Sequence, residues 1–214
     1  MYPGRVPFWV KIAYTLFVCV LVPYYWQTYG PTNFLYFCDV ALLLGLAAAW
    51  LESPLLASMP AVGIFLPQMF WWVDFIAGLL GFSLTGLTAY MFQDSIPLFA
   101  RGLSLFHGWL PFFLLWLVYR LGYDQRALVA WTALAWALML ICYFFLPPPP
   151  APADNPNLPV NINYVYGLSD TQAQTWMPPG VYLVLWMVAL PVVFFLPTHW
   201  ALARLFRPAP ERRI

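Results

Sequence analysis

Residues 126–150 read RALVAWTALAWALMLICYFFLPPPP, and this stretch decides the class of fold. About 20 apolar residues follow Arg126, the length that a helix needs to cross the hydrocarbon core of a bilayer. The four prolines at 147–150 then end the run, because proline lacks the backbone N–H that continues a helix. The stretch therefore predicts a membrane-spanning helix over about 126–146.

The rest of the chain has the same composition. Of its 214 residues, 63% are hydrophobic and 8% are charged, whereas a soluble domain is about 25% charged. A chain of this length cannot hide so much apolar surface in one core, so the excess faces lipid. Six runs are long enough to span, at about 8–26, 33–51, 60–89, 96–121, 126–146 and 180–203. We expect an all-α polytopic integral membrane protein, with one six-helix transmembrane bundle over 1–214 and a proline-rich extracytoplasmic loop at 147–179.

Basic residues predict how this bundle is oriented. Cytoplasmic segments of membrane proteins carry an excess of Lys and Arg. With the N-terminus in the cytoplasm, the residues on that side include Arg5, Lys11, Arg120, Arg126, Arg204, Arg207, Arg212 and Arg213. On the other side lies Arg101. We therefore expect both termini in the cytoplasm and the chain in the inner (plasma) membrane. No small-residue cleavage site follows the first run, which favours a retained helix over a signal peptide.

Several functions are disfavoured by composition. A net charge of +1 gives no indication of nucleic-acid binding. The three cysteines, Cys19, Cys38 and Cys142, all lie inside apolar runs without metal-ligand spacing, so we predict no metal site and no cofactor. The expected partners are membrane lipids and, in a second interpretation, other membrane subunits.

Three ionisable residues lie inside the predicted spans, namely Asp39, Asp74 and His107. From the helical rise, they are expected at depths of about 9, 22 and 16 Å, respectively, below the outer boundary. Charged groups in a span are costly and usually face the protein interior. A tilt or kink of the long third helix would bring Asp74 nearer the surface, so all three residues could meet in one cavity.

Helical spacing adds polar neighbours to this cavity. In the fourth run, Arg101 and Ser104 share a stripe that has His107 on its edge, and in the second run Asn33, Tyr36 and Asp39 share another. We expect Asp39 and His107 to lie within hydrogen-bond reach, directly or through one water. Such a pair has three interpretations: interhelical hydrogen bonding, general-base catalysis, or a histidine that holds a pigment metal or a quinone.

Two quoted segments resemble a known family. QTYGPTNFLYFCDVALL (27–43) and MFQDSIPLF…HGWLPF (91–112) are similar to segments of the androgen-induced and androgen-dependent TFPI-regulating membrane proteins and of bacterial YwaF-like six-helix proteins. The stretch VYGL…PPGVYL (165–183) resembles a later segment of the same family. The chain also resembles uncharacterised bacterial membrane-associated proteins.

The resemblance implies an intramembrane hydrolase of fatty-acid esters that uses a threonine nucleophile and a histidine base. The histidine corresponds to His107 and the aspartate to Asp39, but the threonine position is Tyr36, a departure that puts the nucleophile in doubt. Cys38 is a weak substitute two residues away. We expect catalysis by His107, Asp39 and Tyr36, and binding by Asn33, Arg101, Ser104 and Asp74. The alternative is a non-catalytic subunit of a membrane complex that binds lipid, pigment or partner helices.

Overall fold

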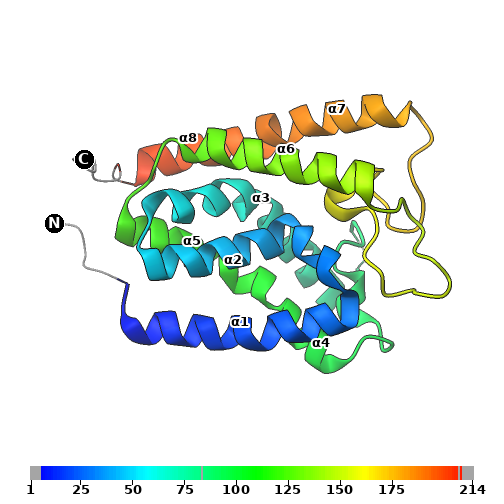
Figure 1. The fold of residues 1–214 in the computed structure, drawn as a ribbon, viewed down its shortest axis with the longest axis horizontal. Helices are drawn as coiled ribbons and strands as arrows, with labels where there is room; N and C mark the ends of the chain where they lie inside the picture. The colour runs from blue at the N-terminus through cyan, green and yellow to red at the C-terminus, as the bar shows by residue number, and fades with distance from the viewer. Residues whose placement is uncertain (1–5, 83, 207, 209–214) are drawn as a thin grey trace.

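The computed structural model describes residues 6–82, 84–206 and 208, and within them the chain forms a bundle of helices (Figure 1). The helices are α1 (Phe8–Tyr29), α2 (Phe37–Leu51), α3 (Pro54–Leu79), α4 (Leu98–Ser104), α5 (Phe106–Leu121), α6 (Ala127–Phe145), α7 (Pro179–Leu190) and α8 (Leu196–Leu205). Short helical turns lie at η1 (Pro31–Leu35), η2 (Ala89–Phe92), η3 (Ile162–Tyr164) and η4 (Pro191–Phe195).

Five helical segments of the described chain are long and apolar enough to cross a membrane. They are Phe8–Tyr29, Pro54–Leu79, Leu98–Leu121, Ala127–Phe145 and Pro179–Leu205. The third of these joins α4 to α5, and the fifth joins α7 to α8 through η4. α2 is a sixth apolar helix, shorter at 15 residues because η1 and Tyr36 precede it. The expected all-α, multi-pass membrane fold is confirmed.

The third span differs from its predicted range of 60–89. It begins earlier, at Pro54, because the first turn of a helix leaves N–H groups unpaired in any case, and proline costs nothing there. The hydroxyl of Ser53 accepts from the N–H of Leu56 and caps this end at 3.4 Å.

The same span also ends earlier than predicted, at Leu79. Gly81 and Gly86 have φ of 83° and 79°, a left-handed conformation that glycine adopts without steric cost and that a helix does not continue through. Asp74 is therefore five residues from the end of α3, about 8 Å by the helical rise, rather than 22 Å. The apolar residues between 80 and 92 belong to a folded connection, not to a helix interior.

Figure 1 shows the N- and C-terminal parts of the chain at the same end of the bundle. Three contacts join the segments that meet there. Lys11 forms an ion pair with Glu52 at 2.8 Å, the hydroxyl of Ser58 accepts from the N–H of Asp124 at 3.0 Å, and Tyr123 and His199 are hydrogen-bonded at 2.6 Å. We call this the terminal end. The segments 30–36, 84–97 and 146–178 gather at the opposite end, which we call the loop end (Figure 1).

α3 is the central helix and packs against α2, α5 and α6. Small residues let its neighbours approach closely, as is usual between membrane helices. The fully buried indole of Trp131 on α6 lies directly against Gly63, where a Cβ would be 1.8 Å from the ring. Gly63 therefore sets the spacing between α3 and α6.

Candidate polar site at the loop end

Asp39 lies in the first turn of α2 and is 3% exposed. Its Oδ2 accepts from Nδ2 of Asn33 at 3.3 Å, and the thiol of Cys38 lies 3.9 Å from the same oxygen. Its Oδ1 is buried and has no hydrogen-bond partner within the part of the chain that the structure describes. The position therefore leaves one carboxyl oxygen of Asp39 for another group.

Ser104, the last residue of α4, is the centre of a second set of polar contacts. Its hydroxyl is 2.9 Å from the hydroxyl of Tyr25 on α1 and also interacts with that of Tyr90. The hydroxyl of Tyr90 accepts from the indole N–H of Trp71 at 3.2 Å. Tyr25 and Tyr90 lie close enough to Asp39 for electrostatic interaction. Five separate segments of the chain thus bring polar groups to one place.

The backbone of Ser104 also forms a hydrogen bond with His107. The imidazole Nδ1 lies 2.7 Å from the backbone carbonyl oxygen of Ser104. A carbonyl can only accept, so Nδ1 carries the hydrogen and Nε2 keeps its lone pair. The imidazole stacks on Trp71 at 5.4 Å and 15° and packs beside Phe106 at 4.1 Å. The backbone and two rings therefore fix both the tautomer and the orientation of His107.

Asp39 and His107 are not hydrogen-bonded to each other in the described structure. Asp39 is bonded to Asn33, whereas His107 is bonded to the backbone of Ser104. The direct form of the predicted contact is therefore absent between these described residues, because α4 ends next to the histidine and supplies a closer acceptor. A link through one water stays a prediction.

Asp74 serves the connection that follows α3. Its Oδ1 accepts from the backbone N–H and hydroxyl of Thr85, at 2.7 and 2.8 Å. Its Oδ2 accepts from the same two groups of Thr88, at 2.8 and 2.7 Å. These four bonds favour a role in holding segment 84–97 in place. The predicted binding role of Asp74 is not tested by them.

Arg101 also contacts this connection, through a bond from Nη1 to the carbonyl of Met91 at 3.2 Å. Its Nε is buried and has no hydrogen-bond partner among the described residues. The side chain thus presents one unused donor, consistent with a residue that could bind an oxygen of a ligand.

The side chain of Asn163, in the long loop, is hydrogen-bonded to the backbone on both sides of Tyr36. The amide of Asn163 donates to the carbonyl of Leu35 at 2.9 Å and accepts from the N–H of Phe37 at 2.9 Å. The backbone carbonyl of Asn163 accepts from the indole N–H of Trp186 at 3.1 Å. The loop is therefore fastened over the start of α2, and Tyr36 is half-buried beneath it.

The sequence analysis missed Tyr25, Trp71, Tyr90 and Asn163. Tyrosine and tryptophan near the end of a span fit an interfacial aromatic belt equally well, so composition could not single them out. Asn163 did leave a signal in the segment VNIN (160–163), where asparagine alternates with buried apolar residues. Its φ of 59° is a left-handed conformation that asparagine tolerates better than most residues.

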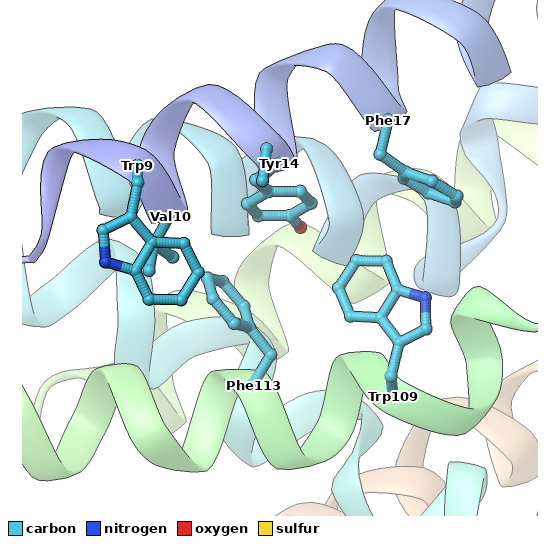
Figure 2. Close-up of a pocket in the computed structure, with 7 residues that line it drawn as sticks. Trp9, Val10, Tyr14, Phe17, Trp109 and Phe113 are labelled. Atoms are coloured by element: carbon cyan, nitrogen blue, oxygen red, sulfur yellow. The ribbon is translucent and has the colours of Figure 1, made fainter.

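The described structure has two hollows that the predicted polar residues do not line. One hollow, of about 300 Å³, lies on the loop surface and is lined by residues of the segment 168–176. The other, of about 240 Å³, lies between α1 and α5 (Figure 2) and is lined by Trp9, Val10, Ala13, Tyr14, Phe17, Trp109 and Phe113.

The chain matches no protein-family model, no curated protein and no solved structure.

Proposed function

We propose that this chain hydrolyses or transfers acyl esters of lipid-like substrates inside the membrane, with His107 as the general base. The observation that carries the proposal is the bond from Nδ1 of His107 to the carbonyl of Ser104, which leaves the lone pair of Nε2 for a proton. The family resemblance of segments 27–43 and 91–112 supports the same residue. Its fatty-acid ester substrates suit a protein whose surroundings are lipid.

The chemistry needs a nucleophile and a group that stabilises the oxyanion. Nε2 of His107 would take the proton of the attacking group as a bond forms to the ester carbon, and would return it to the departing alkoxide. The attacking group is the hydroxyl of Tyr36 by the resemblance, with the thiol of Cys38 or a water as alternatives. The hydroxyls of Tyr25 and Ser104 are donors suited to the negative charge that develops on the carbonyl oxygen.

We expect purified protein in lipid nanodiscs to release fatty acid from a long-chain ester, and we expect Tyr36→Phe to lower the rate. This substitution removes the hydroxyl and leaves the ring to pack. The rate is measured by mass spectrometry of the released acid. Tyr119→Phe is the matched control, because Tyr119 is 60% exposed on α5, and it should leave the rate unchanged.

Full activity in Tyr36→Phe would exclude its hydroxyl as the nucleophile and move that role to Cys38 or to water. A lack of hydrolysis of any ester, by the wild type and by Tyr36→Thr alike, would remove the catalytic proposal.

A second candidate function is a non-catalytic subunit that binds lipid or partner helices. The observation in its favour is the outer face of α1, where large apolar side chains such as Phe8, Leu16 and Trp26 are more than half exposed. Lipid alone accounts for such a face, so this function ranks second.

We further propose that the protein lies in the inner (plasma) membrane with both termini in the cytoplasm. The basic side chains of Lys11, Arg120, Arg126 and Arg204 support this orientation, since all belong to segments at the terminal end. An alkaline phosphatase inserted at the exposed Asn155 should be active, and one fused after the C-terminus should be inactive. Equal activity at both positions would contradict the model of six crossings.

A further inference from the structure

The groove between α1 and α5 is lined almost entirely by carbon. Five of its seven lining residues are aromatic, and the labelled rings face one another across the two helices (Figure 2). The hydroxyl of Tyr14 is directed away from it and donates to the carbonyl of Leu42 at 2.6 Å. Phe17 and Trp109 pack edge to face at 5.2 Å at the deeper end of the groove. An occupant therefore has to be apolar along its whole length.

The dimensions of the groove match a single acyl chain. From Trp9 to Phe17, α1 rises about 12 Å. A volume of about 240 Å³ spread over that length corresponds to a channel of roughly 20 Å² in cross-section, whereas a helix with its side chains is about 10–12 Å across. A single file of methylene groups, which pack at separations of about 4 Å, does fit such a channel. The length is close to half of the roughly 30 Å hydrocarbon core, which is one leaflet.

Positive charge lies beyond the open end of the groove. Trp9 is one residue from the start of α1, so the groove opens toward the terminal end. On α5, the ring of Trp116 packs against Phe113 at 5.6 Å, and the guanidinium of Arg120 lies over Trp116 at 5.7 Å from its centroid. Arg120 is about 10 Å beyond Phe113 along the helix. Lys11 adds a second positive charge on α1, partly offset by its partner Glu52.

We propose that this groove binds one acyl chain of an anionic phospholipid from the leaflet at the terminal end. Its phosphate lies at the level of Arg120, and its chain lies along Tyr14, Phe113 and Trp109. Basic residues next to a membrane surface attract anionic headgroups, and the groove gives the chain contacts with five aromatic rings. This lipid site does not depend on the ester chemistry proposed for the loop end.

The test uses a photoreactive phosphatidylglycerol, with a diazirine in the middle of one chain, in nanodiscs of phosphatidylcholine. We expect saturable adducts on the peptides that contain Trp9–Phe17 and Trp109–Phe113. Unlabelled phosphatidylglycerol should compete, and added phosphatidylcholine should not. Ala13→Trp fills the groove and should lower this labelling by about tenfold, the ratio expected when contact with about two methylene groups is lost.

Cys19→Trp is the matched control, because Cys19 is an exposed small residue on the same helix outside the groove, and its labelling should equal that of the wild type. Val10→Phe is a second groove-filling variant, for use if Ala13→Trp does not fold. Undiminished labelling in a folded groove variant would overturn the proposal, as would equal competition by phosphatidylcholine. Disulfide-linked dimers of Ala13→Cys would assign the groove to a second copy of the chain and would overturn it too.

Discussion

Replacing His107 by alanine should lower the rate of ester hydrolysis by about 10²–10⁴-fold, the range that removal of a general base typically costs. Nε2 is the atom that would take the proton, because the bond from Nδ1 to the carbonyl of Ser104 places the lone pair of the neutral imidazole on Nε2. The measurement is the initial rate of fatty-acid release by purified wild type and variant at equal protein concentration, with thermal unfolding of each recorded alongside.

Two further variants make this result interpretable. His107→Gln keeps an amide that can donate to Ser104 but has no basic nitrogen, so it should be as inactive as His107→Ala and closer to the wild type in stability. His199→Ala removes the other histidine, which is bonded to Tyr123 at the terminal end, and should leave the rate unchanged. A variant at position 107 that remains folded and retains full activity would show that this imidazole is not the base.

The second large effect is expected at Gly63. In Gly63→Ala, the new Cβ would lie 1.8 Å from the indole of Trp131, which is fully buried and packs against Phe37 and Phe195. Because the ring is enclosed on all sides, we expect the free energy of unfolding to fall by about 3 kcal/mol, the upper part of the usual overpacking range. For a chain of this size, the apparent Tm should fall by roughly 6–12 °C.

The control for this variant is Gly102→Ala, also in a helix, where a Cβ would meet nothing within 4 Å. Its Tm should stay the same or rise, since alanine favours a helix by about 1 kcal/mol over glycine. Trp131→Phe should restore part of the loss in the double variant, because the smaller ring vacates the space beside Gly63. A wild-type Tm for Gly63→Ala would contradict the packing of α3 against α6. Thermal unfolding in detergent, followed by size-exclusion chromatography, measures all four proteins.

The sequence by itself determined the class of fold and nearly all of its spans. Runs such as 126–146 have one low-energy state in lipid, a helix that pairs its own backbone groups, so length and composition are sufficient to predict them. The same reasoning failed between 80 and 89, where apolar residues continue but two glycines with positive φ end the helix. Hydropathy does not register a backbone conformation, so this boundary was predicted about ten residues too late.

For the polar site, the sequence identified the residues that must face the protein interior, because the cost of exposing an ionisable side chain to lipid depends on the residue type alone. The choice of their partners depended on the tertiary structure. Asp74 binds Thr85 and Thr88, and His107 binds the backbone of Ser104, instead of either meeting Asp39 directly. Hydrogen bonds act over about 3 Å, whereas helical spacing fixes only which face a side chain occupies. Which face meets which neighbour, and at what height, was decided by how the helices pack and where they end.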